Sequence, residues 1–254
     1  MEYYKLDFIS QNDFEQHVLN TIKEYEKNFQ NINLKNLNKN IIDPIKLLFD
    51  KNVSNLSYED IIKFEINRQI DKSNNNSIGY FHQNIFKFIK NCTVPKKGWD
   101  IIYNGEKKYY VEMKNKHNTM NSSSSQKTYM KFLNHLVNSD EKDSVCVLVE
   151  IIAKSSQNIP WIITLDGEKQ LPNERIRRIS IDKFYEIVTG DKNAFYKICY
   201  QLPKTIEKLV NSEKNVVNKD HVNDILNELK KIDSDLLIAF YKLAFSEYEG
   251  FNLL

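Results

Sequence analysis

One stretch of the sequence, residues 98–114, carries charged residues at a spacing that suits metal-dependent chemistry. It places Asp100 ahead of a Glu112-x-Lys114 pattern. Side chains alternate between the two faces of a β-strand, so Glu112 and Lys114 share a face, roughly 6.5 Å apart along the strand. Two carboxylates from neighbouring strands suit Mg²⁺, which prefers oxygen ligands and keeps several waters. Such an ion polarises a phosphate and activates water, while a nearby Lys stabilises developing charge. The pattern therefore indicates metal-dependent phosphodiester hydrolysis, and the alternative is a solvated hairpin with a chance Asp and Glu-x-Lys.

The strands that must position these groups are predicted at 99–103 and 107–114, joined as a hairpin. The Asn104-Gly105 pair is typical of a two-residue turn. That turn, however, would set Asp100 opposite Tyr109, on the face away from Glu112. A shared metal requires Asp100 to lie opposite or diagonal to Glu112. We therefore predict a loop with an odd number of residues, three or five, spanning Gly105 and Glu106, or a β-bulge that restores the pairing.

The rest of the chain is predicted as one α/β domain, residues 1–254, with a mixed sheet flanked by helices. Residues 1–95 are expected to be mainly helical, 96–181 to hold the sheet, and 182–254 to form a helical C-terminal cap. Within the N-terminal region we expect helices at 11–30, from Asp43-Pro44, from Ser57 to about Gln69, and at 78–89, with a polar loop at 70–77. A helix is expected from Ser122 to about Val137, and strands are expected at 144–153, 161–165 and 176–181.

Composition limits the class of protein. The chain has 254 residues, a formal net charge of +2, and 41% hydrophobic residues with 14 Phe and 14 Tyr, which excludes a wholly disordered chain. No apolar run approaches the roughly 20 residues of a membrane span, and the N-terminus does not resemble a signal peptide. The cysteines Cys92, Cys146 and Cys199 have no close pairing and no zinc-ligand spacing, which indicates reduced thiols and a cytoplasmic protein.

A family resemblance adds to this interpretation. The Asp, hairpin and Glu-x-Lys arrangement resembles the core of PD-(D/E)XK nucleases, although Trp99 stands where that core often has Pro. Residues 112–123, Glu-Met-Lys-Asn-Lys-His-Asn-Thr-Met-Asn-Ser-Ser, are similar to the signature of type II restriction endonucleases of AsuI specificity, which cut GGNCC. Asp43-Pro44 with the following Leu-Leu-Phe-Asp, and Glu65-x-x-Arg68-Gln69 with the later Ile-Gly-x-Phe-His-Gln, are also similar to that family. The resemblance runs from about residue 40 to 152 and is weak in the C-terminal third.

The resemblance implies a Mg²⁺-dependent endonuclease that cuts double-stranded DNA at GGNCC and leaves a three-base 5′ overhang. It implies Asp100 and Glu112 as metal ligands and Lys114 as the catalytic lysine. Glu65 is a further catalytic candidate from an upstream helix, and its alternative is an ordinary exposed helix Glu. A two-fold site with two scissile bonds suggests a homodimer. A cognate DNA methyltransferase is expected to act on the same site without forming a stable complex.

Residues that leave the catalytic strand are expected to contact DNA because they follow the metal site directly. They are Lys116, His117, Asn118, Thr119, Asn121 and Ser122, whose groups can bind phosphates and base edges. For His117 the alternative is a loop histidine without a role. Arg68, within the family-like helix segment, is added to this set.

Arginine is scarce in this chain: only Arg68, Arg175, Arg177 and Arg178 occur. Arg offers a planar fork that can bind guanine O6 and N7 together, which makes the last three candidates for base reading. In a strand, Arg175 and Arg177 would share a face and Arg178 would lie opposite. Phosphate binding or a solvated edge strand are the alternatives. Glu150, inside an apolar strand, is expected at the strand end or paired with a Lys rather than in catalysis.

Two rival functions remain at this point. One is another nuclease on the same core, such as a repair or junction-resolving enzyme. The other is a DNA-binding module that kept the core without activity. The complete set of Asp100, Glu112 and Lys114 argues against the second.

Overall fold

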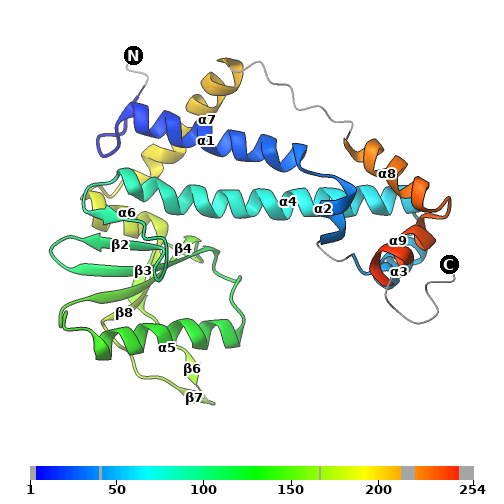
Figure 1. The fold of residues 1–254 in the computed structure, drawn as a ribbon. Coiled ribbons are helices and arrows are strands. Elements are labelled where there is room, and N and C mark those ends of the chain that lie inside the picture. Colours follow the sequence, from blue (N-terminus) through cyan, green and yellow to red (C-terminus); the bar gives the residue numbers. More distant parts are fainter. Residues whose placement is uncertain (1–3, 40–41, 166, 213–220, 246–254) are drawn as a thin grey trace. The chain divides into compact units, whose positions relative to one another are not determined.

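The computed structural model describes residues 4–39, 42–165, 167–212 and 221–245 (Figure 1). The chain divides into two compact units. The first, unit 1, comprises the described residues within 1–20 and 78–212, and the second, unit 2, those within 21–77 and 213–254. Two long helices, α1 (Gln11–Gln30) and α4 (Tyr58–Asn84), each contribute residues to both units. That all 254 residues form a single domain stays a prediction.

Unit 1 is built on a six-stranded mixed sheet in the order β1-β2-β3-β4-β8-β5. Its strands are β1 (Cys92–Thr93), β2 (Ile101–Asn104), β3 (Lys108–Lys116), β4 (Val145–Ile152), β5 (Asn158–Pro160) and β8 (Ile176–Ser180). The strands β3, β4 and β8 are parallel, and the other neighbours are antiparallel. The apolar run of β4 is buried on both faces over its first six residues, as its sequence predicts for a central strand. The expected mixed sheet flanked by helices is therefore confirmed.

The hairpin between β2 and β3 has the predicted odd-numbered loop. Its pairs run from Asn104 opposite Lys108 to Ile101 opposite Val111, so residues 105–107 form a three-residue connection. A Cβ at Gly105 would lie 2.4–2.5 Å from the outer ring atoms of Tyr103, so a larger residue here would require that ring to move. The register, continued by one residue, brings Asp100 opposite Glu112, and the two-residue Asn104-Gly105 turn does not form.

Helix α5 (Ser122–Asn138) lies against one face of the sheet (Figure 1). This is the face of Glu112, whose side chain is bonded to Lys131 of the helix. The start of α5 is capped by Asn121, whose side-chain oxygen accepts from the Ser124 N–H at 2.8 Å. A buried cluster joins this helix to the sheet: Tyr110, Tyr129, Phe132, Cys146, Leu148, Trp161 and Ile176. Each large side chain buried here contributes roughly 1.5–3 kcal/mol. This packing fixes the helix over the hairpin.

Further helices complete unit 1. These are the short 3₁₀ helix η1 (Ile85–Phe88), α6 (Ile181–Thr189) and α7 (Ala194–Ser212). Phe86 of η1 packs against Phe184 and Tyr185 of α6, with ring centroids 5.1 and 4.8 Å apart. The predicted strand at 161–165 is mostly wrong: only β6 (Thr164–Leu165) forms, paired with β7 (Glu168–Lys169). Trp161 instead follows β5, with its N–H bonded to the Ile176 carbonyl at 2.9 Å and its ring in the core cluster.

Unit 2 is helical. It contains α2 (Leu34–Lys39), α3 (Pro44–Ser54), α8 (His221–Ile232) and α9 (Leu236–Phe245), packed with the N-terminal half of α4 around a separate apolar core. The helix predicted from Asp43-Pro44 forms as α3, and Asp43 caps it by accepting from the main-chain N–H groups of Ile45 and Lys46. The helices expected as one C-terminal cap are thus divided, with α6 and α7 in unit 1 and α8 and α9 in unit 2.

The predicted loop at 70–77 is wrong, because α4 continues through it without a break. Asn and Ser disfavour a helix by only a few tenths of a kcal/mol each, which tertiary contacts can offset. Here Asn28 of α1 donates to the side chains of Asn74 and Ser77 at 3.0 and 3.1 Å. The polar run is therefore a helix face that pairs with α1. In the described part of the chain, no helix has the length and apolar character needed to span a membrane.

Candidate active site

Asp100 directly precedes β2, and its main chain and side chain both bond to β3. Its N–H donates to the carbonyl of Val111 at 3.0 Å, and its carboxylate Oδ2 accepts from the N–H of Met113 at 2.7 Å. Met113 separates Glu112 from Lys114 in the sequence. The hairpin thus brings three of the four predicted catalytic residues, Asp100, Glu112 and Lys114, close together on the sheet.

Glu112 is largely buried, with 16% of its side chain exposed, and it is paired with a cation from α5. The ammonium of Lys131 donates to its Oε1. Burial raises the pKa of Glu112 above its ordinary value; the charge of Asp100 acts in the same direction and Lys131 in the opposite one. The two carboxylates are therefore close enough to repel each other, and a cation beside them relieves that repulsion.

Lys114 follows on the same face of β3 and has Glu150 of β4 as its register neighbour. Glu150 is 2% exposed and forms a two-bonded ion pair with Arg178 of β8, in which Nε lies 2.8 Å from Oε2. The expected neutralisation of Glu150 therefore occurs, through an Arg instead of a Lys. Arg178 also donates to the carbonyl of His117 at 3.2 Å, so the pair holds the chain where it leaves the catalytic strand.

The sequence interpretation missed two groups at this site. One is Lys131, one residue before the buried Phe132 on α5. The other is Gln83 near the end of α4, whose Nε2 donates to the main-chain carbonyl of Asp100 at 3.1 Å. Lys131 had no local signal. Gln83 ends the Ile-Gly-x-Phe-His-Gln segment that resembles the family, but nothing in the sequence gives the rotation of either helix against the hairpin.

The segment expected to contact DNA runs from Lys116, at the end of β3, to Ser122, at the start of α5, and it is mostly exposed. Its exposed members are Lys116, Asn118, Thr119, Asn121 and Ser122, whereas His117 is half-buried. Three residues of the segment also make hydrogen bonds that hold its main chain in place. The Thr119 hydroxyl donates to the Lys116 carbonyl at 2.8 Å, Asn121 caps α5, and the His117 N–H donates to the Ile152 carbonyl at 3.0 Å. The segment is therefore ordered and accessible beside the carboxylates.

Within β8, Arg178 lies on the face of Glu112 and Arg177 on the other, as strand alternation predicts, whereas Arg175 precedes the strand. Arg175 donates to the main-chain carbonyls of Ser144 and Glu141. Arg177 donates to the side chain and carbonyl of Asn158 at 2.6 Å each, and pairs with Glu174. These contacts give all three guanidinium groups partners within the protein. Base reading by any of them stays a prediction.

Glu65 lies in unit 2, whereas Asp100, Glu112 and Lys114 lie in unit 1. It is buried, and it bonds to Arg68 and Gln69 of its own helix. The hydrogen bonds from these residues keep its pKa low in spite of burial. Arg68 remains 57% exposed. The structure therefore gives Glu65 partners of its own, and its participation in catalysis stays a prediction.

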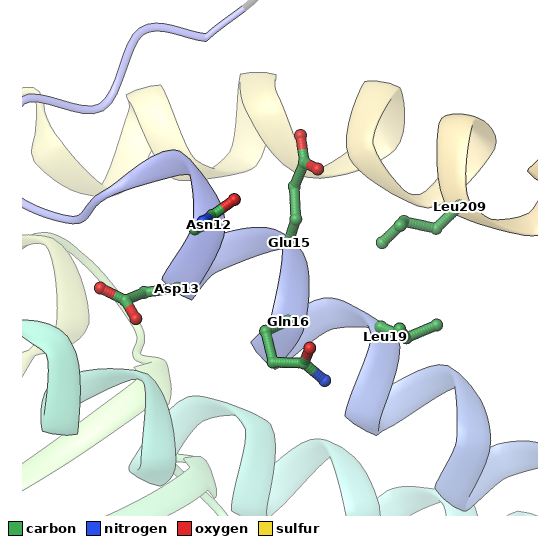
Figure 2. Close-up of a pocket in the computed structure, with 6 residues that line it drawn as sticks. All are labelled: Asn12, Asp13, Glu15, Gln16, Leu19 and Leu209. Atoms are coloured by element: carbon green, nitrogen blue, oxygen red, sulfur yellow. The ribbon is translucent and has the colours of Figure 1, made fainter.

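A surface pocket of about 450 Å³ lies away from these residues, between α1 and α7 (Figure 2). Its lining is Asn12, Asp13, Glu15, Gln16, Leu19 and Leu209. Lys208 of α7 donates to both carboxylate oxygens of Glu15, at 2.7 and 2.9 Å. The pocket is thus a mainly polar surface pocket between two helices, and none of the predicted site residues line it.

The donor set at the hairpin fits a hard cation with few protein ligands. In the described part of the chain no three His, Cys, Asp or Glu side chains cluster as a closed metal cage. Mg²⁺ is commonly held by one or two carboxylates and keeps several waters, which is what Asp100 and Glu112 offer. That a cationic group already sits on Glu112 indicates that this position attracts positive charge.

Comparison with known proteins gives concordant results. A model of the Eco47II restriction endonuclease family matches residues 6–211, which include the whole sheet and the hairpin. The type II restriction enzyme Sau96I of Staphylococcus aureus is 30% identical over 219 residues, covering 82% of each chain. The type II restriction enzyme Eco47II of Escherichia coli is 30% identical over 213 residues, covering 81% of this chain and 88% of that enzyme.

Proposed function

Because this chain belongs to the Eco47II restriction endonuclease family, we propose that it cleaves both strands of DNA at GGNCC in a Mg²⁺-dependent reaction. Its class is that of type II restriction enzymes, which are site-specific deoxyribonucleases. The proposal adds a PD-(D/E)XK core, the recognition sequence, the metal and the residues that act.

The observation that carries the proposal is the bond between Asp100 Oδ2 and the Met113 N–H. It supports a site in which the carboxylates of Asp100 and Glu112 face one ion. Two carboxylates that repel each other in a partly buried place cost free energy, and packing of the hairpin alone does not require them.

The roles follow from the chemistry of each group. Asp100 and Glu112 would hold Mg²⁺, which when bound would polarise the scissile phosphate and make water more acidic. The side chain of Lys114 makes no hydrogen bond or ion pair among the described residues, although its main chain pairs with β4. Its ammonium is thus available to orient the attacking water and to stabilise negative charge that develops on the phosphate.

DNA is proposed to lie against the exposed segment that leaves β3. Lys116, Asn118 and Ser122 have no side-chain hydrogen bonds among the described residues and can bind phosphates or base edges. Two copies of the chain, related by a two-fold axis, would place one such site on each strand and leave three-base 5′ overhangs. A methyltransferase of the same specificity would protect host DNA without binding this protein stably.

Digestion of a plasmid of known sequence tests the proposal. With Mg²⁺ we expect discrete fragments whose sequenced ends all lie within GGNCC and carry three-base 5′ overhangs. EDTA and the variant Asp100→Asn should each abolish them. Smears, nicks without sequence preference, or ends at another motif would refute the proposed specificity, and uncut DNA would refute the activity.

A further inference from the structure

Lys131 lies where α5 crosses the proposed metal site, and its ammonium makes three contacts there. It donates to Glu112 Oε1 and to the main-chain carbonyl of Gly98, and it lies 4.1 Å from the centroid of the Trp99 ring. These contacts come from three different positions in unit 1. The ammonium of this lysine, and not only its aliphatic part, is therefore held at the site.

The surroundings of this ammonium are fixed. The Trp99 ring packs against Tyr110, Phe132 and His135, with centroids 5.2, 5.6 and 5.1 Å away. An indole face attracts a cation by about 0.5–2 kcal/mol. Two of the three contacts, the indole and the Gly98 carbonyl, do not involve a metal-binding group. They can keep the ammonium close by when it leaves Glu112.

We propose that Lys131 is a positioning residue that serves as the internal counter-ion of Glu112 in the metal-free enzyme. When Mg²⁺ binds, the contact with Glu112 breaks, and the ammonium keeps its contacts with Trp99 and Gly98. The inference rests on the proposed function, since it takes Glu112 as a metal ligand. It assigns to α5 a role in metal loading that is separate from the role of Lys114.

Electrostatics gives the direction of the effect. Without a cation, the carboxylates of Asp100 and Glu112 repel each other in a half-buried place. The ammonium relieves that repulsion, and a divalent ion bound to the same carboxylates would repel the ammonium in turn. Metal binding therefore includes the loss of the contact between Lys131 and Glu112. Removing the ammonium should tighten metal binding.

Calorimetric titration of the full chain with MgCl₂ and with CaCl₂, without DNA, tests this. For Lys131→Met we expect the dissociation constant to fall by about tenfold, a coupling of ordinary size between two sites. Lys127→Met is the matched control, because Lys127 is an exposed lysine one turn earlier on α5. It should change the constant less than about twofold by general charge alone. An unchanged or weaker metal affinity in Lys131→Met would overturn the proposal.

A double-variant cycle separates this inference from the proposed function. Glu112→Gln should lose most of the metal binding, and adding Lys131→Met to it should have no further effect. If Glu112→Gln binds metal as the unmodified protein does, the proposed metal site itself fails and the counter-ion role fails with it. If Glu112→Gln abolishes binding while Lys131→Met leaves it unchanged, only the counter-ion role is refuted.

A measurement on the unmodified protein covers the case in which Lys131→Met does not fold. Lysines are acetylated briefly with and without Mg²⁺, and the extent at each site is read by mass spectrometry. Release from Glu112 should make Lys131 react at least about twice as fast with Mg²⁺, whereas Lys127 should not change. Equal labelling of Lys131 under both conditions would overturn the proposal.

Discussion

The carboxylate of Asp100 accepts a hydrogen bond from the main-chain N–H of Met113, the residue between Glu112 and Lys114. One oxygen of Asp100 is thereby committed to β3, and the other is left for a ligand. The bond ties the first strand of the hairpin to the second at the point where the chemistry is proposed. An Asn at this position can make the same bond through its amide oxygen, so it removes the charge while keeping the geometry.

The first prediction concerns catalysis. Asp100→Asn and Lys114→Met should each lower the single-turnover cleavage rate by at least about 10²-fold, because each group acts mainly on the transition state. Specific DNA binding, measured by fluorescence anisotropy in Ca²⁺, should change less than about fivefold. Efficient cleavage by either variant would remove its residue from the catalytic set.

The hairpin shows how far sequence can lead when two rules conflict. Turn preference alone favours Asn104-Gly105 as a two-residue turn. Strand alternation, together with the need for Asp100 and Glu112 on one face, required an odd loop, and the structure has three residues there. The functional constraint was the stronger guide, because a shift of one residue moves every side chain to the other face.

Other features of the site lay outside what sequence could predict. Lys131 and Gln83 reach the hairpin from helices, and a helix rotation set by packing leaves no mark on local spacing. The pairing of Glu150 with Arg178 joins residues far apart in the chain. The helix through 70–77 depends on contacts with α1 that override weak local propensity.

The second prediction concerns that buried ion pair. Arg178→Met should lower the free energy of unfolding by about 3–5 kcal/mol, because it removes the partner of Glu150, which is 2% exposed. Adding Glu150→Leu should restore most of the loss. Urea unfolding measures both, and Lys27→Met, which breaks an exposed pair with Glu24, should cost less than about 1 kcal/mol. If the double variant is as unstable as Arg178→Met alone, the unpaired buried carboxylate of Glu150 is not the cause of the lost stability.

The third prediction concerns base reading by Arg177. Its bonds to Asn158 and Glu174 lead us to expect a structural role, so Arg177→Lys should lower thermal stability and leave the preference for the cognate site within about twofold. A residue that binds guanine through both nitrogens would instead lose about 1–3 kcal/mol on the cognate site alone. Competition binding with cognate and single-substituted DNA distinguishes the two. A selective loss would make Arg177 a base reader that exchanges its protein partners for DNA.

The last prediction concerns acid. Burial lowers the pKa of His82 to about 4, with a smaller contribution from the charge of His17. Below about pH 6.5 the unfolded chain binds a proton at this position, while the folded protein stays neutral until about pH 4. Protonation thus favours unfolding throughout that window, and His82 alone should lower the free energy of unfolding by about 2 kcal/mol between pH 7 and pH 5. His82→Gln should reduce that pH dependence. Urea unfolding at the two pH values measures the difference, and an equal pH dependence in His82→Gln and the unmodified protein would contradict the assignment.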